Sequence, residues 1–117
     1  MTHFGHYVRE QRERLQRNDR RYSLRQVAQR IGLEPAYLSK IERGETPPPS
    51  EGAIVKLAGE LGEDPDVLLA MAGKVSGDLQ EIIRKRPKLF ATLLRELKTA
   101  PEHAILSVVR EVRDGNW

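Results

Sequence analysis

Apolar residues recur along this chain at the spacing of amphipathic helices. Leu24, Val27, Ala28 and Ile31 stand at i, i+3, i+4 and i+7, which places all four on one stripe of an α-helix. The other stripes expected to face a core are Phe4, Val8 and Leu15 in residues 3–17, with Tyr7 and Gln11 beside them; Tyr37, Leu38 and Ile41 in residues 35–43; Ile54, Leu57, Ala58 and Leu61 after Ser50; and Val67, Leu68 and Met71 after Asp64. The pattern predicts five helices in the first 73 residues.

Residues that start or stop helices separate these stripes. Ser23 and Gln26 have the spacing of a capping box, in which the Ser hydroxyl accepts the N–H of residue 26 and the Gln side chain reaches back to Ser23. The remaining start and stop residues are Gly32, Pro35, Gly44, Ser50 and the pair Asp64–Pro65.

The pattern changes after residue 73. The apolar positions there are Leu79, Ile82 and Ile83; then Leu89, Phe90, Leu93, Leu94 and Leu97; and finally Ile105, Val108, Val109 and Val112. Pro87 separates the first two groups, and a second predicted capping box, Thr99-x-Pro101-Glu102, opens the last. We therefore expect an all-α fold, with a five-helix bundle in residues 1–73 and about three C-terminal helices in residues 74–117.

Composition supports a helical bundle. Aromatic residues make up 5% of the chain and charged residues 32%, so a core must consist mainly of aliphatic side chains. The absence of Cys rules out disulfides and thiolate metal sites, and fits a reducing compartment. There is no apolar run of membrane-spanning length and no hydrophobic signal-peptide region. We expect a soluble, cytoplasmic protein with no membrane partner.

The sequence lacks the residue patterns of a catalytic site. It contains no glycine-rich phosphate loop, no nucleophile elbow and no paired acids that predict a cleft. His3 and His6 stand at i and i+3, but no carboxylates of ligand spacing accompany them, so we interpret them as surface histidines. We expect no enzyme activity, no metal and no cofactor.

Basic charge is segregated along the chain. Residues 1–45 hold ten Arg or Lys against six acids, residues 46–73 hold one against five, and residues 74–117 hold nine against six. The densest basic run is Arg14, Arg17, Arg20, Arg21 and Arg25. This distribution indicates an anionic partner, with a solvated basic surface as the alternative.

The segment from 23 to 43 predicts two short helices joined by a tight turn. In helix-turn-helix proteins such a pair offers its second helix to the DNA major groove, which is about 12 Å wide and displays a readable pattern of donors and acceptors. The second helix must then have a polar outer face and small residues at its start. Pro35 and Ala36 are small, and Ser39, Lys40 and Arg43 follow on the face that the apolar residues leave free.

The residues of this segment also resemble a known family. "SLRQVAQRIGLEPAYLSKIERGETPPPS", residues 23–50, is similar to the core of the Cro/XRE phage-repressor-type helix-turn-helix family. Its hallmarks here are Ala28, Gly32 at the turn, "YLSKIERG" in the second helix and the Pro-Ser start of the next. The similarity covers residues 4 to about 72.

The resemblance implies roles at matching positions. Base contacts are implied for Glu34, Pro35, Ala36, Ser39 and Lys40. Phosphate contacts are implied for Ser23, Arg25, Gln26, Arg43 and Thr46. The resemblance also implies a structural ion pair between Arg12 and Glu42. Arg17, Arg20 and Arg21, in a longer loop than compact members have, are additional candidates for DNA contact, or else simply a charged loop.

One position departs from the family pattern. The residue before Pro35 is usually Ser or Thr, but here it is Glu34. A carboxylate suits the positive end of a helix, yet it would repel a phosphate. It could instead accept a hydrogen bond from a cytosine amino group.

The sequence thus predicts a sequence-specific regulator that binds double-stranded DNA as a homodimer at a pseudo-palindromic operator. A repressor that inserts helix 35–43 into the major groove is the expected form. The alternative is an antitoxin-like protein-interaction regulator, whose C-terminal helices hold a regulatory protein partner. "RKRPK", residues 84–88, allows an additional phosphate-binding patch or the polar side of helices that pack through Leu79, Ile82, Ile83 and Phe90, and we favour the second.

Overall fold

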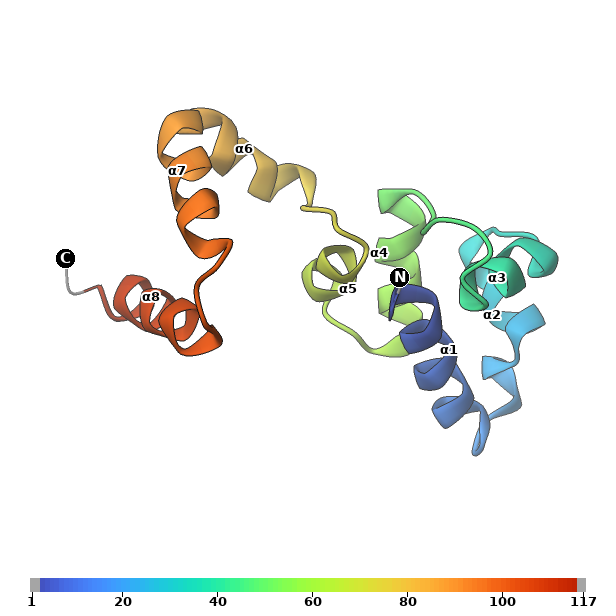
Figure 1. Cartoon of the computed structure of the whole chain (residues 1–117). Coiled ribbons are helices and arrows are strands. Elements are labelled where there is room, and N and C mark those ends of the chain that lie inside the picture. The colour runs from blue at the N-terminus through green and yellow to red at the C-terminus, as the bar shows by residue number, and fades with distance from the viewer. Residues whose placement is uncertain (1–2, 116–117) are drawn as a thin grey trace. The chain divides into compact units, whose positions relative to one another are not determined.

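This computed structural model describes residues 3–115, which contain eight α-helices and one short 3-10 helix joined by turns and loops (Figure 1). The elements are α1 (His3–Gln16), η1 (Arg20–Tyr22), α2 (Leu24–Ile31), α3 (Pro35–Glu42), α4 (Glu51–Leu61), α5 (Pro65–Met71), α6 (Gly77–Lys85), α7 (Pro87–Leu97) and α8 (Glu102–Asp114). These residues contain no β-strand. The predicted all-α fold, with five helices followed by three, is confirmed.

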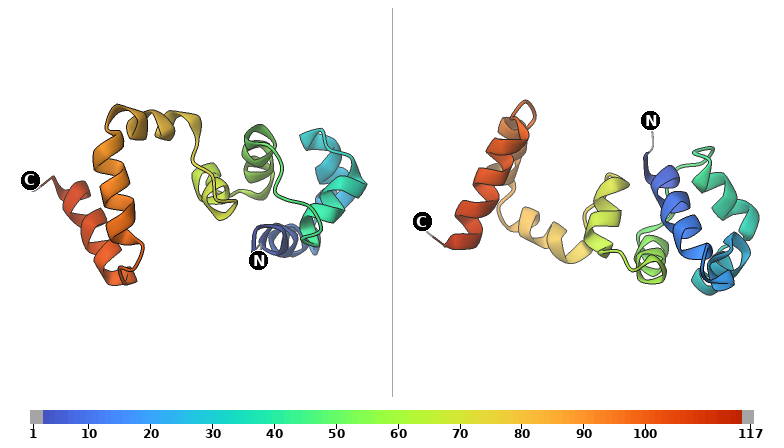
Figure 2. Two further views of the ribbon diagram at one scale, coloured as in Figure 1. Left: turned by 45° about the horizontal axis from the view of Figure 1, so that its top comes forward. Right: turned by 90° about the horizontal axis from the view of Figure 1, so that it is seen from below.

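The chain divides into two compact units, Met1–Ser76 and Gly77–Trp117. The first unit contains α1 to α5. Figures 1 and 2 show its short helices gathered around one centre, where α1 and α2 both pack against α3, and α4 packs against α5. This arrangement leaves one side of α3 without a neighbouring helix to cover it, because α3 contacts only α1 and α2 extensively.

Three predicted caps start helices in the first unit. Ser23 Oγ accepts the N–H of Gln26 at 3.2 Å, and Ser50 Oγ accepts that of Ala53 at 3.3 Å. Asp64 accepts the N–H of Asp66 at 2.8 Å. These bonds satisfy backbone donors that have no partner within the helix. The box at Ser23 is only half formed, because the Ser23 N–H donates to the Arg20 carbonyl at 3.1 Å and not to a Gln side chain.

The second predicted capping box is wrong. Helix α8 begins at Glu102, and its N-cap is Pro101 in an extended conformation with φ −71° and ψ 160°. Had Thr99 been the cap, Ala100 would have been helical, and a residue that precedes proline is disfavoured there by a clash with the proline ring. The proline therefore moves the start of the helix past Thr99.

The core of the first unit is formed by aliphatic side chains and one Phe. Its buried members are Phe4, Val8, Val27, Ala28, Ile31, Leu38, Ile41, Ile54, Leu57, Ala58, Leu61, Leu68 and Leu69. Most of them come from the predicted stripes. Tyr7 borders the core and donates its hydroxyl to the Glu63 carboxylate at 2.6 Å, which raises the tyrosine's pKa above its usual value.

Three predicted core positions are wrong. Tyr37 is 38% exposed, because α3 buries Leu38, Ile41 and Glu42, and Tyr37 lies one residue off that stripe. In α5 the buried pair is Leu68 and Leu69, whereas Val67 is 50% exposed and Met71 is 37% exposed. A helix of seven residues has too few turns for its apolar pattern to specify the inward face.

Gly5 permits the close approach of α1 to α3. A Cβ atom at this position would lie 2.0 Å from the carbonyl oxygen of Ile41, a distance that no real Cβ contact shows. Glycine is therefore required where the two helices cross. Gly32 serves a different need, since its φ of 77° ends α2 in the left-handed region.

The second unit buries no residue in any of its three helices. Helix α6 contacts α7 where the chain bends between them (Figure 2), but large apolar side chains remain open to solvent along all three helices. The exposed ones are Leu79, Ile82, Leu89, Leu93, Leu94, Ile105, Leu106, Val108, Val109 and Val112. None of the helices between residues 3 and 115 is long and apolar enough to cross a membrane.

Candidate nucleic-acid interface

Arg12 and Glu42, expected as a structural ion pair, join α1 to the end of α3. Arg12 Nε lies 2.7 Å from Glu42 Oε2, and Nη2 lies 2.9 Å from Oε1, so the pair is bidentate. The two side chains are only 6% and 3% exposed. Two charges this deeply buried are tolerated because each neutralises and hydrogen-bonds the other.

The third nitrogen of Arg12 reaches toward α2. Its Nη1 donates to the side chain of Gln16 at 3.0 Å and to the Tyr22 carbonyl at 3.1 Å. Tyr22 immediately precedes Ser23, the cap of α2. One guanidinium group therefore ties the start of α2 to the end of α3.

The outer face of α3 carries most of the predicted base contacts. Glu34, Ala36 and Lys40 are exposed, while Pro35 and Ser39 are partly exposed. Glu34 is the N-cap residue, but its side chain makes no capping bond. Within the described residues the ammonium group of Lys40 has no hydrogen-bond partner, so it is available to a ligand. Tyr37, exposed on the same helix, adds an aromatic ring that the interpretation as a core residue had missed.

Arg43 is not free on this surface. Its guanidinium donates to Ser39 Oγ and to the carboxylate of Glu45, with Nη2 at 3.4 Å from Glu45 Oε1. The bond to Glu45 raises the pKa of Arg43, and the bond from Arg43 lowers the pKa of Glu45. The sequence analysis missed Glu45, because its only signal was a carboxylate two residues from an arginine.

The predicted phosphate contacts on α2 lie together at its start. Arg25 and Gln26 are exposed, and Ser23 is partly exposed with its hydroxyl engaged as a cap. Thr46 differs, since its hydroxyl oxygen is buried and has no hydrogen-bond partner among the described residues. A contact from that hydroxyl to DNA would require the loop to move.

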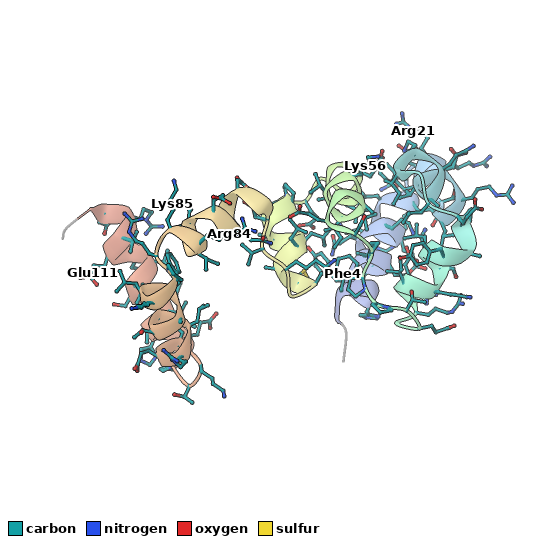
Figure 3. All side chains as sticks on the ribbon, turned by 90° about the horizontal axis from the view of Figure 1, so that it is seen from above. Phe4, Arg21, Lys56, Arg84, Lys85 and Glu111 are labelled. Carbon is teal, nitrogen blue, oxygen red and sulfur yellow. The ribbon has the colours of Figure 1, made fainter. Side chains whose placement is uncertain are left out.

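The loop arginines differ in their surroundings. Arg21, whose side chain projects from the first unit in Figure 3, binds Asp19 with Nη2 at 2.8 Å from Oδ2. This bond lowers the pKa of Asp19 and raises that of Arg21. Arg17 and Arg20 are exposed, and their guanidinium groups have no hydrogen-bond or ion-pair partner within the described chain.

A second arginine, Arg30, contacts Tyr22 at the end of the loop that precedes α2. Arg30 on α2 binds Glu60 on α4 at 2.8 Å, and its guanidinium carbon lies 5.5 Å from the centre of the Tyr22 ring. This distance is typical of a cation–π contact. The Arg30–Glu60 bond joins residues 30 positions apart in sequence, so no local pattern predicted it.

A small surface cavity of about 140 Å³ lies where these elements meet. Its lining comes from α1, the start of α2 and the outer side of α3. The lining residues are Arg9, Arg12, Glu13, Leu24, Ser39, Glu42 and Arg43. Arg9, which the sequence analysis did not select, is paired with Glu13 at 3.3 Å. The predicted base and phosphate sides of the surface therefore adjoin one another.

No group of three or more potential metal ligands occurs in the described part of the chain. Of the two N-terminal histidines, the side chain of His3 lies outside what the structure describes. His6 Nε2 lies 3.7 Å from Glu10 on the same helix, and both side chains are well exposed.

Comparison with protein families places the first unit. A family model described as a helix-turn-helix domain matches residues 3–71, more than half of the chain. The family is associated with Cro/XRE-type DNA-binding regulators, which confirms the resemblance seen in residues 23–50. The searches find no matching curated protein and no matching solved structure. The chain belongs to the helix-turn-helix domain family of DNA-binding regulators.

Proposed function

We propose that this protein is a sequence-specific repressor that binds double-stranded DNA as a homodimer, with α3 in the major groove. The observation that carries the proposal is the outer face of α3, where small residues precede Ser39 and an unpaired Lys40. Small residues allow the backbone to approach the bases, and the polar side chains that follow can read their edges.

Four of the predicted base-contact residues have proposed partners. Lys40 donates to the acceptors of guanine, which are the preferred partners of Lys in the major groove. Glu34 accepts from a cytosine amino group, and its unused carboxylate is available for this bond. Pro35 and Ala36 make apolar contacts near the start of the helix.

Phosphate contacts at the start of α2 fix the register of α3. Arg25 and Gln26 extend from its first turn, where free backbone N–H groups and the helix dipole also favour an anion. The Arg12 bonds hold this helix start against the end of α3. The spacing between phosphate and base contacts is thus set by the buried Arg12 guanidinium group. In this proposal residues 1–73 form the DNA-binding domain.

The second unit supports the dimeric part of the proposal. Its three helices expose ten large apolar side chains and bury none, although each helix is amphipathic. Covering such a surface with a second copy removes apolar area from water, at about 25 cal/mol per Å². To read adjacent half-sites, the two α3 helices of a dimer formed through residues 74–117 must reach points about 34 Å apart, one turn of DNA, on a pseudo-palindromic operator.

Repression then requires no chemistry by the protein, since a dimer at an operator blocks access to the promoter. The exposed apolar faces of α6 to α8 equally favour a second candidate, an antitoxin-like regulator whose C-terminal helices bind another protein. The two candidates differ in the mass of the purified protein, which is that of a dimer in the first and of a monomer awaiting its partner in the second.

Lys40→Ala tests the proposed mode of binding. Loss of a base contact is expected to weaken binding to the selected operator by about 1–3 kcal/mol, or about 5- to 150-fold, with little effect on unrelated DNA. Lys56→Ala is the matched control, because Lys56 is an exposed lysine on α4 and away from α3. Fluorescence anisotropy with labelled duplexes measures both. Equal losses for the two variants would contradict the proposed role of α3.

A further inference from the structure

Arg43 uses all three of its side-chain nitrogens within the protein. Nη1 donates to Ser39 Oγ, while Nε and Nη2 face the two oxygens of the Glu45 carboxylate. Ser39 lies one helical turn before Arg43, and Glu45 lies in the loop after α3. The three side chains form a chain of hydrogen bonds from a loop carboxylate to the outer face of α3.

This arrangement determines how Ser39 can meet a ligand. A hydroxyl group has one proton and two lone pairs, and here Oγ accepts an N–H from Arg43. The Ser39 proton must therefore point away from Arg43, and within the described residues it has no acceptor. Because Glu45 is anionic, it keeps Arg43 charged and oriented, and the charged donor polarises the hydroxyl. Ser39 is left as a hydrogen-bond donor.

We propose that Glu45 and Arg43 are positioning residues that make Ser39 a hydrogen-bond donor, so that Ser39 selects a base edge carrying an acceptor. In the major groove such acceptors are the N7 of either purine, the O6 of guanine and the O4 of thymine. The amino groups of cytosine and adenine are donors, which can meet only the second lone pair of Oγ and leave the hydroxyl proton without an acceptor, so they fit less well. The proposal rests on the proposed placement of α3 in the major groove.

Arg43 thereby has a role different from the phosphate contact that the family resemblance implies. For Arg43 to bind a phosphate with its bidentate edge, it would have to leave Glu45. The released carboxylate would then lie beside the phosphate and repel it. The network avoids this cost by using the carboxylate to orient Arg43, while Lys40 stays unpaired for direct contact with DNA.

The two roles predict different results for the full-length protein on random duplex DNA. The measurements are base preference at each operator position and the dependence of affinity on salt, for wild type, Ser39→Ala, Arg43→Ala and Glu45→Gln. We expect Ser39→Ala and Arg43→Ala to lose about 3- to 10-fold of preference at the same base pair. The double variant Ser39→Ala, Arg43→Ala should lose little more preference than either single variant. Glu45→Gln should lose part of the same preference.

The salt dependence separates positioning from phosphate contact. The slope of log affinity against log salt is negative. Removing a phosphate contact makes it shallower by about 0.9, whereas removing a positioning residue leaves it unchanged. Arg25→Ala is the positive control, since a phosphate contact there predicts the shallower slope and equal weakening on all sequences. Circular dichroism confirms that each variant keeps its helices.

Three results would overturn the proposal. If Arg43→Ala makes the salt slope shallower and weakens binding to every sequence equally, Arg43 is a phosphate contact. The positioning of Ser39 by Arg43 and Glu45 then fails, while the proposed function stands. The positioning proposal also fails if Glu45→Gln strengthens binding to all sequences, because the carboxylate then only repels DNA. A wild-type protein with no base preference at any position would overturn the proposed function, and the positioning proposal with it.

Discussion

Replacing Arg12 with Met should destabilise the first unit far more than the loss of an ordinary surface charge. The substitution leaves the Glu42 carboxylate, only 3% exposed, without its bidentate partner. Removing one member of a buried ion pair typically costs about 3–5 kcal/mol. Small domains unfold with about 5–15 kcal/mol in total, so this loss is a large fraction of the stability. The Tyr22 carbonyl also loses its donor, which frees the start of α2.

Urea unfolding followed by circular dichroism measures the effect, and a double-mutant cycle assigns it. We expect Arg12→Met and Glu42→Met each to cost several kcal/mol. The double variant should cost less than the sum, because it leaves no buried charge unpaired. Arg9→Met is the matched control on α1, since Arg9 is half exposed, and it should cost at most about 1 kcal/mol. An Arg12→Met variant as stable as the Arg9 control, or strictly additive effects in the cycle, would refute the reasoning.

Three further predictions concern packing, pH and assembly. Gly5→Ala should cost about 1–3 kcal/mol of stability and weaken DNA binding, because the added Cβ would push α3 away. Gly59→Ala, at an open helical position, should instead stabilise the protein by about 0.5–1 kcal/mol in the same urea assay. Tyr7→Phe should cost about 1 kcal/mol of unfolding free energy at neutral pH, as measured by urea titration. Because the hydrogen bond raises the tyrosine's pKa, the difference in unfolding free energy from wild type should hold below pH ~10 and shrink as the pH rises above it. Leu93→Asp should convert the proposed dimer to a monomer in analytical ultracentrifugation, and Thr92→Asp, on the same helix, should not.

Local signals in the sequence predicted the framework of the first unit correctly. Ser23, Ser50 and Asp64 act as caps because each bond joins residues two or three apart. The stripe from Leu24 to Ile31 also holds, since α2 is long enough for its periodicity to define one inward face. Both features depend only on neighbouring residues.

Features set by contacts between distant residues were not predictable in this way. Gly5 looks unremarkable in sequence, and only the crossing of α1 and α3 shows why a side chain is excluded there. Tyr37 is apolar enough for a core position, but the packing angle of α3 turns it outward. The cation–π contact of Arg30 with Tyr22 needs the loop and α2 to be placed first.

The candidate site shows the same division. Residue types and spacing selected Lys40 and Ser39, and the structure places both on the outer side of α3. The sequence could not show that Arg43 is already engaged, because its bonds to Ser39 and Glu45 depend on side-chain geometry at a helix end. Nor could it show that the hydroxyl of Thr46 is buried.

The proposed function requires that a dimer read DNA sequence through α3. Selection of random duplex DNA by the purified full-length protein, followed by titration of the recovered sequence against salt, measures this property. We expect an inverted repeat whose half-sites are about one helical turn apart, with a preference that persists as salt weakens overall affinity. Recovery of no common motif, with affinity set by salt alone, would contradict it.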